Sequence, residues 1–459
     1  MTEPAAQLVE RLRTTFASGR TRSIEWRRAQ LEALAAMLSD NEEAILAALV
    51  TDMGKVPFEA WAGDIASSIT ETKYLAKHVA DWAKDDRVRI PLTLQPGRAI
   101  IRYQPRGVVL VIAPWNYPVY LLATPLAAAL AAGNAVVCKP SEVVPATSAL
   151  ITRLASEYLD PDAITFVEGG VEETTALLQE RFDYILYTGN GTVGRIVAEA
   201  AAKHLTPTTL ELGGKSPAIV DRDANLKQAA SRIAFAKWSN AGQTCIAVDH
   251  VWAHRDIHDE LVDRIVAEVR ERYGVNPRES ADFGRIVNER HAARIKGLLD
   301  RGGYDEIVLG GEVDVDACYI APTVVTGTKP SAALMNEEIF GPVLPVLSFD
   351  DISEPLAHIN AADHPLALYV FSRKNADTVL NGTTSGGACV NDTMFQIFPP
   401  NLPFGGVGES GHGAYHGKWG FDTFSHRRAI YRRPGFYVEP ALAKAPYTAI
   451  KERVARLIY

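Results

Sequence analysis

Short apolar segments alternate with longer helix-forming stretches from Gly107 onward, and this alternation limits the folds that the chain can adopt. The apolar segments are rich in β-branched residues and lie at 107–112, 135–138, 163–167 and 183–187. A helical stretch between two strands is a crossover connection, so such strands pair in parallel within a sheet that helices cover on both faces. The sequence therefore predicts an α/β fold built on a parallel sheet.

A second alternating region begins after Glu211 and runs to about Asn391, with a strand expected at 249–253 and a helix at 257–273. We interpret it as a second α/β domain. Two segments fit neither domain, 87–103 and 420–431. We expect them to extend as arms that pair with another element or another subunit.

The two ends of the chain have helical periodicity. Ser39-x-x-Glu42 fits a capping box ahead of an apolar run, and Gly54 stands where that helix is expected to stop. Apolar residues from Tyr447 to Leu457 also recur at helical spacing. They predict a C-terminal helix with a docking face.

The composition is that of a soluble globular protein, because 47% of the 459 residues are hydrophobic and 22% are charged. The net charge of -8 comes from 55 acidic and 47 basic residues that are interspersed, so we expect no nucleic-acid partner. The longest apolar run, 117–132, contains two prolines and is too short for a membrane span, and the amino terminus lacks the apolar core of a signal peptide. We expect a cytoplasmic protein without a membrane anchor.

The most unusual loops follow the predicted strands of the first sheet. They are Ala113-Pro-Trp-Asn116, Lys139-Pro-Ser-Glu142, Glu168-Gly-Gly170 and the glycine-rich segment Thr188–Gly194. Ligands of open parallel sheets bind beyond the carboxyl ends of the strands. The sequence therefore predicts a ligand site at this edge of the sheet.

Gly189-x-Gly191-x-x-Gly194 follows a strand and opens the helical run 195–203, which is the context required of a dinucleotide fingerprint. Glycines also serve tight turns, so the motif alone is weak. An acidic residue about twenty positions further on usually holds a ribose, and Glu211 has this spacing. Glu211 also suits a general base at a strand end, or it is a solvated or salt-bridged side chain, and the spacing leaves the three hypotheses open.

Cys245 is an isolated cysteine at the end of Ser239-Asn-Ala-Gly-Gln-Thr-Cys245. The other cysteines are Cys138, Cys318 and Cys389, and their spacing matches neither a disulfide framework nor a metal site, so we expect no bound metal. An isolated cysteine is most often a small buried hydrophobe. The glycine and the polar neighbours of Cys245 favour a nucleophile instead.

Six motifs resemble, in order and along nearly the whole chain, those of the aldehyde dehydrogenase superfamily. They are Pro114-Trp-Asn-Tyr-Pro118, Gly133-Asn-Ala-Val-Val-Cys-Lys-Pro-Ser-Glu142, Glu211-Leu-Gly-Gly-Lys215, Gly242-Gln-Thr-Cys245, Glu337-Glu-Ile-Phe-Gly-Pro342 and Leu402-Pro-Phe-Gly-Gly-Val-Gly408. Near the end, Tyr415-His-Gly417 and Thr423-Phe-Ser-His-Arg-Arg428 resemble the class 3 branch.

The resemblance implies a division into domains and an assembly. It implies a Rossmann-type dinucleotide-binding domain formed by 1–86 and 104–211, and a catalytic α/β domain at 212–410. It further implies a homodimer, bridging or oligomerisation segments at 87–103 and 411–435, and a C-terminal helix at 436–459.

The resemblance also implies that Cys245 attacks an aldehyde as the nucleophile, forming a thiohemiacetal and then a thioester. The Asn116 side-chain amide and the Cys245 backbone N–H would hold the oxyanion, and Glu211 would activate the water that hydrolyses the thioester. Without the resemblance, Asn116 would be interpreted as a turn residue.

In the family pattern the cofactor is a nicotinamide dinucleotide. Lys139 and Glu142 would contact the adenosine ribose, Glu338 the nicotinamide ribose, and Phe340 would lie against that end. The Glu142 carboxylate suits the ribose hydroxyls of NAD and repels the extra phosphate of NADP, although Lys139 offsets the repulsion, so we expect NAD with NADP possible. Further cofactor contacts are expected from Gly189, Asn190, Gly191, Thr192, Val193, Gly194 and Leu212.

By position, Tyr117, Phe235 and Trp238 are candidates to line the approach to Cys245, and their rings favour a medium-chain aliphatic or aromatic aldehyde as substrate. Three alternative functions stay open. They are a CoA-acylating relative, against which Glu211 argues, an inactive binding or structural relative, and a cofactor-free thiol hydrolase in which the Gly189 loop would have no task.

Overall fold

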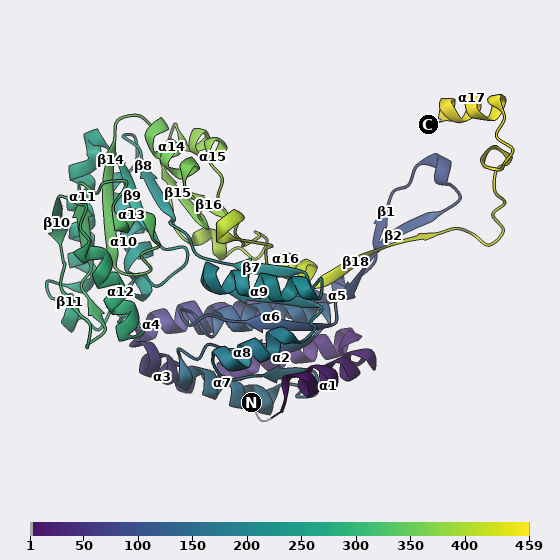
Figure 1. The fold of residues 1–459 in the computed structure, drawn as a ribbon, viewed down its shortest axis with the longest axis horizontal. Coiled ribbons are helices and arrows are strands. Elements are labelled where there is room, and N and C mark those ends of the chain that lie inside the picture. The colour runs from purple at the N-terminus through teal and green to yellow at the C-terminus, as the bar shows by residue number, and fades with distance from the viewer. Residues whose placement is uncertain (1–2, 459) are drawn as a thin grey trace.

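The computed structural model describes residues 3–458, which form a main body with two large sheets and an arm that projects from it (Figure 1). The sheets have six and seven strands, and helices lie over them. The predicted α/β class with parallel sheets is confirmed. Residues 1, 2 and 459, which fall within the predicted ranges 1–86 and 436–459, lie outside the described residues.

The first sheet consists of β3 Val108–Ile112, β4 Ala135–Lys139, β5 Ile164–Phe166, β6 Tyr184–Thr188, β7 Thr208–Glu211 and β17 Gly411–His412. Its strand order is β17-β7-β6-β3-β4-β5, and every neighbouring pair is parallel except β17 and β7. The four strands predicted from the apolar segments form within one residue of their expected ends. Their carboxyl ends therefore meet at one edge of the sheet.

Helices cover both faces of this sheet. They are α1 Ala5–Ala17, α2 Ile24–Asp40, α3 Glu42–Met53, α4 Pro57–Ala60, α5 Ser67–Trp82, α6 Tyr120–Ala132, α7 Pro145–Tyr158, α8 Val171–Gln179 and α9 Gly191–Lys203. Val109 and Val111 of β3 pack in one core with α2, α5 and α6, whereas Val108 and Leu110 pack in another with α1, α8 and α9. Because alternate side chains of β3 enter two cores, its sequence is apolar without interruption.

The predicted capping box at Ser39 and Glu42 is wrong. Ser39 lies within α2, where its hydroxyl donates to the Ala36 carbonyl oxygen, and Asn41 separates α2 from α3. The helical periodicity before Ser39 already extends α2 to Asp40, so no helix begins at Ser39. Gly54 does end α3, with a φ of 56° in the left-handed region that glycine adopts freely.

The second sheet consists of β8 Pro217–Val220, β9 His250–His254, β10 Glu306–Leu309, β13 Thr323–Thr326, β14 Val343–Phe349, β15 Ala367–Phe371 and β16 Gly387–Val390. Its order is β10-β13-β14-β9-β8-β15-β16, and only the edge strand β10 is antiparallel. Its helices are α10 Leu226–Trp238, α11 His258–Tyr273, α12 Glu289–Asp300, α13 Ala333–Asn336, α14 Ser353–Ala361 and α15 Ala376–Gly382, and a hairpin joins β11 Val313–Asp314 to β12 Tyr319–Ile320. The strand predicted at 249–253 and the helix at 257–273 are confirmed as β9 and α11.

The arm is a three-stranded antiparallel sheet of β1 Asp86–Val88, β2 Arg98–Pro105 and β18 Ser425–Arg432. The two segments predicted as arms therefore pair with each other. Residues 411–424 of the predicted bridging or oligomerisation segment lie outside this arm, because β17 joins the first sheet and α16, Gly417–Thr423, packs against α5 and α6.

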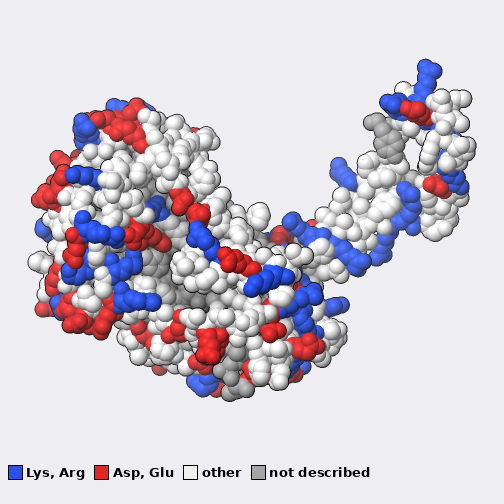
Figure 2. All heavy atoms as spheres, in the orientation of Figure 1, with Lys and Arg blue, Asp and Glu red and all other residues white. Residues whose placement is uncertain are grey.

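The arm differs in charge from the main body. In Figure 2 both signs are mixed over the visible face of the body, while Lys and Arg predominate along the arm. Arg427, Arg428, Arg432 and Arg433 lie on β18 or directly after it. The predicted interspersion of charge therefore holds for that face of the body but not for the arm.

The C-terminal helix is shorter than the predicted range 436–459. Helix α17 spans Ala449–Ile458, and a short turn at Ala441–Ala443 is the main regular feature between it and β18. Pro434, Pro440 and Pro446 interrupt this segment, and proline lacks the N–H that a helix interior needs. Among residues 3–458, no helix combines the length and the apolar content that crossing a membrane requires.

Candidate active site

A cavity of about 540 Å³ opens at the carboxyl ends of β3, β4, β6 and β7. Its wall combines the loops after these strands with residues of the second α/β region. Most of the predicted site residues line it, namely Asn116, Lys139, Glu142, Gly189, Asn190, Val193, Glu211, Leu212, Cys245, Glu338 and Phe340. The fold therefore brings these residues together although they are spread over most of the chain.

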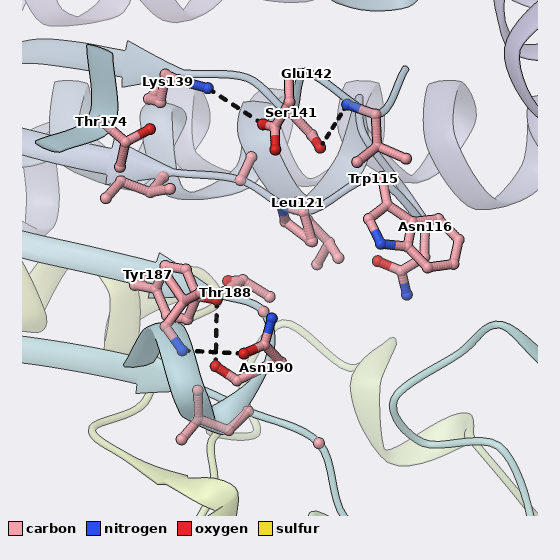
Figure 3. Close-up of a pocket in the computed structure, with 18 of the residues that line it drawn as sticks. Trp115, Asn116, Leu121, Lys139, Ser141, Glu142, Thr174, Tyr187, Thr188 and Asn190 are labelled. Carbon is pink, nitrogen blue, oxygen red and sulfur yellow. Dashed lines mark hydrogen bonds and ion pairs between the residues drawn. The ribbon is translucent and has the colours of Figure 1, made fainter. Parts of the chain in front are cut away.

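Three predicted cofactor residues do not line the cavity, and they are Gly191, Thr192 and Gly194. All three belong to the first turn of α9, where Asn190 is the N-cap and its side-chain oxygen accepts from the Val193 N–H (Figure 3). Gly194 has a packing role, because a Cβ there would lie 2.8 Å from Leu212 Cδ2. The glycine motif thus faces the cavity only at its start.

The loop that ends in Cys245 follows α10 and has unusual backbone geometry. Asn240 and Ala241 have positive φ values of 52° and 51°, and Gly242 has a φ of 77°. A Cβ at Gly242 would collide with the Gly341 carbonyl, so glycine is required there. These torsion angles aim the end of the loop at the cavity.

The Cys245 thiol is not acidic in this setting. Its side chain is only partly exposed, and loss of hydration, followed by the negative charges of Glu338 and Glu211, raises the pKa of the thiol to about 12. At neutral pH the group is therefore a thiol, and a base has to remove its proton before it can act as a nucleophile.

Glu211 is the last residue of β7 and is 2% exposed. Among the described residues, neither of its carboxyl oxygens has a hydrogen-bond partner, and burial raises its pKa well above the ordinary value. The salt-bridged hypothesis for Glu211 is therefore wrong. An unpaired carboxyl is costly to bury, and groups of this kind are typical of proton-transfer sites.

Asn116 lies in the loop between β3 and α6 and is buried. Its side-chain nitrogen donates to the Gln243 carbonyl oxygen at 3.0 Å, which ties it to the Cys245 loop. Its own carbonyl oxygen accepts from Lys55 Nζ at 3.0 Å and from Asn240 Nδ2 at 3.1 Å. An amide has two N–H groups, so a second one is left for a ligand in the cavity that Asn116 lines.

Lys139 and Glu142 form an ion pair at another part of the wall (Figure 3). The Lys139 Nζ lies 3.6 Å from Glu142 Oε2 and donates to the Pro140 carbonyl oxygen at 2.7 Å. Lys139 is buried and its pKa is lowered by loss of hydration, whereas 52% of the Glu142 side chain is exposed. This pair can present both a cation and hydrogen-bond acceptors to a ligand.

Glu338 and Phe340 enter the cavity from the loop before β14. Burial first, and then the charge of Asp249, raises the pKa of Glu338 to about 7. Its carboxyl lies directly against Gly213, where any Cβ would collide with it. The Phe340 ring stands edge-on to Trp115, with 5.4 Å between ring centroids.

The sequence analysis missed a basic group on α12 that lines the cavity, formed by Arg290, His291 and Arg294. Arg294 donates to the carbonyl oxygens of Glu338 and Ile339 at 3.1 Å and 2.5 Å. Burial first, then the two arginines, lowers the pKa of His291 to about 4. The spacing of Arg290 and Arg294 does indicate one helix face, but charged helix faces are usually solvated, so the signal was weak.

The three aromatic candidates for the substrate approach differ in their positions. The Tyr117 hydroxyl lies 3.0 Å from Thr244 Oγ1, next to Cys245, and Phe235 packs against Phe395. Trp238 is a wrong prediction, because it is buried in the core and its indole N–H donates to the Pro342 carbonyl oxygen.

No bound metal is indicated by the side chains. Within residues 3–458, no group of three His, Cys, Asp or Glu side chains has an arrangement suited to a metal ion. All four cysteines are free. A cleft of this size beyond parallel strands, with a thiol and an unpaired carboxyl in its wall, is typical of a cofactor-dependent α/β enzyme.

Comparison with known proteins gives the family. Residues 2–430 match the aldehyde dehydrogenase family, and the chain belongs to it. Aldehyde dehydrogenase family 3 member A2 of Rattus norvegicus is 46% identical over 92% of this chain and 87% of its own. The Rattus norvegicus protein named aldehyde dehydrogenase, dimeric NADP-preferring, is 46% identical over 92% and 93%. The substrate-bound state of Staphylococcus aureus AldH is 40% identical, has a TM-score of 0.95 and is matched over 99% of both chains.

The chain is therefore an NAD(P)-dependent aldehyde dehydrogenase, and its predicted resemblance to the class 3 branch is confirmed by the family 3 relatives.

Proposed function

We propose that this enzyme oxidises a medium-chain aliphatic or aromatic aldehyde to its carboxylic acid through a covalent bond to Cys245. The observation that carries the proposal is that Cys245, Glu211 and Asn116 line one cavity, with the Glu211 carboxyl unpaired. A nucleophile, a base and an amide donor are the groups that acyl chemistry on a thiol needs.

The first step is attack of Cys245 Sγ on the aldehyde carbon. The thiol proton has to leave first, because the pKa of the group is raised to about 12. Glu211 is the group that accepts this proton, because it is the acidic residue of the cavity whose carboxyl oxygens have no hydrogen-bond partner among the described residues. Both groups act in their deprotonated forms, so the rate rises with pH as they ionise.

The carbonyl oxygen of the aldehyde becomes an oxyanion when the carbon–sulfur bond forms. The free N–H of the Asn116 side chain and the Cys245 backbone N–H hold this charge. Because Asn116 is already fixed by its bond to the Gln243 carbonyl, it needs no reorganisation during the reaction.

The adduct on Cys245 then becomes a thioester and is hydrolysed. Bound NAD(P)+ supplies the acceptor for the hydride that leaves the carbon. After the proton from Cys245 has passed to solvent, Glu211 takes a proton from a water molecule, which attacks the thioester carbon, and the carbon–sulfur bond breaks to release the acid and the Cys245 thiolate. A raised pKa makes the Glu211 carboxylate a stronger base than an exposed carboxylate.

The cavity fits a nicotinamide dinucleotide in size and in donor set. Lys139 and Glu142 would hold the adenosine ribose, and Glu338 the nicotinamide ribose with Phe340 against that end. Asn190, Val193 and Leu212 also line the wall, and Arg290 and Arg294 of α12 would offer cations to the anionic part of the cofactor. Gly189, in the loop before α9, would let backbone approach the cofactor at this wall.

NAD is the proposed cofactor, with NADP also accepted, since Lys139 is beside Glu142 and one relative is named NADP-preferring. A homodimer is proposed, because that relative is named dimeric and large apolar side chains are exposed on the arm, such as Leu92, and directly after it, such as Phe436 and Val438. Light scattering that gives a monomer would contradict the dimer. A cytoplasmic location also stays a proposal, which cell fractionation tests.

The test of the chemistry is to quench the enzyme with acid during turnover of an aldehyde panel and to map the acyl group by mass spectrometry. We expect the acyl group on Cys245, with free carboxylic acid as product whether or not CoA is present. An acyl group elsewhere, or acyl-CoA as the product, would contradict the proposal.

A further inference from the structure

A buried ion pair, Lys55 and Asp64, lies directly behind the Asn116 loop. The Lys55 Nζ lies 2.7 Å from Asp64 Oδ2, and both side chains are 0% exposed. Asp64 belongs to a π-helical turn at Trp61–Ala66, between α4 and α5. Such turns are rare and are frequent at functional sites.

The pair holds both ends of the segment 116–120. At its start, Lys55 Nζ donates to the Asn116 carbonyl oxygen at 3.0 Å. At its end, Asp64 Oδ1 accepts from the N–H groups of Val119 and Tyr120 at 3.1 Å and 3.2 Å. Asp64 thereby supplies the acceptor and the negative charge that the amino end of α6 lacks in its own sequence.

The same lysine also contacts the side chain between these two anchors. Its Nζ lies 3.8 Å from the centre of the Tyr117 ring, and the Tyr117 hydroxyl lies 3.0 Å from Thr244 Oγ1. The close approach of Tyr117 needs Gly63, because a Cβ at that position would lie 2.8 Å from the ring. The pair is therefore connected to the Asn116 loop and, through Tyr117, to the residue before Cys245.

A buried ion pair is a poor source of stability, since taking two charges out of water offsets most of their attraction. Here every polar side-chain atom of the pair is directed at the Asn116 loop or at its partner. This arrangement orients a loop rather than filling a core.

We infer that Lys55 and Asp64 are positioning residues for aldehyde oxidation, which fix the Asn116 backbone so that its side-chain amide meets the developing oxyanion. The inference rests on the proposed role of Asn116. Neither residue lines the cavity. Without the pair, the Asn116 carbonyl keeps only its bond from Asn240, so the backbone that carries the side-chain amide is held less firmly and the amide, although still bonded to the Gln243 carbonyl, is displaced from the position that the reaction requires.

The test is a double-mutant cycle between the pair and Asn116. The double variant Lys55→Met with Asp64→Asn has no charge at either position. The side-chain oxygen at position 64 still accepts from the Val119 and Tyr120 N–H groups, so the start of α6 keeps its cap. We expect kcat/KM for the aldehyde to fall by about tenfold or more, with the Kd of NAD+ unchanged because Lys139 and Glu142 are untouched. In an Asn116→Ala background, the same two substitutions should lower kcat/KM by less than about threefold.

An equal loss in both backgrounds would overturn the inference, because the pair would then act on overall structure and not through the Asn116 amide. No loss in the wild-type background would overturn it as well. If Asn116→Ala alone has full activity, the proposed oxyanion role fails instead, which is a separate result. Should the double variant not fold, Asp64→Asn alone carries the test. It should lower kcat/KM several-fold in the wild-type background and by less in the Asn116→Ala background.

Arg13 offers a matched control. Its guanidinium lies 2.9 Å from Asp183 Oδ2, which accepts from the Val108 N–H at 2.8 Å, so this pair also holds a backbone segment, at the amino end of β3. Arg13→Met should leave kcat/KM unchanged, because that pair is at the opposite end of the strand from the cavity.

Discussion

At the Cys245 end of the cavity, Glu211 has no partner for either carboxyl oxygen, whereas at the Lys139 end the ammonium group lies 3.6 Å from the Glu142 carboxylate. Loss of hydration raises the pKa of both Glu211 and Cys245, while Glu142 stays about half exposed. The ionisable groups are thus buried and unpaired at one end of the cavity, and paired with a half-exposed carboxylate at the other.

The difference separates reactivity from binding. A buried carboxyl without a cation is costly when ionised, and the same cost makes it a strong base. A paired, half-exposed carboxylate costs little and is weakly basic, so it suits recognition of hydroxyl groups. Substitutions at the Cys245 end should therefore change rates by orders of magnitude, and those at the Lys139 end should change cofactor preference by small factors.

The largest expected effect is that of Cys245→Ala. Loss of the sulfur removes the covalent pathway, so NADH production from any aldehyde should fall by at least about 10⁴-fold. The Kd of NAD+, measured by quenching of protein fluorescence, should stay within about threefold of the wild-type value. Turnover retained in this variant would show that Cys245 is not the nucleophile.

Glu211→Gln should have the second-largest effect, a loss of about 10²-fold to 10⁴-fold in kcat. The glutamine has nearly the same shape but cannot accept a proton, so acyl-enzyme should accumulate and be detectable by mass spectrometry. Wild-type kcat should rise with pH above the range in which an ordinary carboxyl ionises, because burial raises the pKa of the base. A Glu211→Gln variant with the same pH profile and no acyl-enzyme would assign the base to another residue.

The same substitution should affect stability in the opposite sense. In the unfolded chain Glu211 ionises near its ordinary pKa of about 4.3, whereas in the folded chain burial keeps the proton on. Stability of the wild type is therefore lost as pH rises above the ordinary value, by up to about 1.4 kcal/mol per pH unit. Urea unfolding should show an advantage for Glu211→Gln that is near zero at about pH 4 and larger at about pH 8. An advantage that does not depend on pH would contradict the burial of an unpaired carboxyl.

Asn116→Ala should lower kcat/KM by about 10²-fold, on the order of 3 kcal/mol of transition-state stabilisation. Asn116→Asp is the discriminating control. Aspartate serves a turn as well as asparagine does, so a turn residue would tolerate it. A donor to an oxyanion would not, because the new carboxylate repels the developing charge, and the loss should exceed that of the alanine variant. Near-normal activity of Asn116→Asp would return Asn116 to the role of a turn residue.

The strands and the loops at their ends could be predicted from sequence because both depend on local patterns. The segments at 107–112 and 183–187 are buried on both faces, and such strands are apolar throughout. The start of α3 at Glu42 was harder to predict, because two helices with a single residue between them leave no clear break in the periodicity of apolar residues. The C-terminal helix was overextended, since its periodicity outweighed Pro440 and Pro446.

The site residues also divide into those with a local sequence signal and those without one. Resemblance supplied Asn116 and Glu338, whose types and spacing alone favour a turn residue and a surface charge. Nothing local distinguishes Lys55 or Asp64 from the solvated charges of any helix, because their burial depends on packing against a loop that lies far along the chain. Trp238 failed for the converse reason, since an aromatic side chain near a site is most often part of the core.

Glu142→Gln should have the smallest effect and is the sharpest test of the Lys139 end. Removing the carboxylate leaves the Lys139 ammonium without its partner and removes the repulsion toward a ribose phosphate. Because the Glu142 carboxylate is half exposed, the change should be worth about 1 kcal/mol, or roughly a fivefold lower KM for NADP. The KM for NAD should rise by less than about threefold and kcat should not change. A fall in kcat of the size expected for Glu211→Gln would mean that the two ends of the cavity do not divide binding from chemistry.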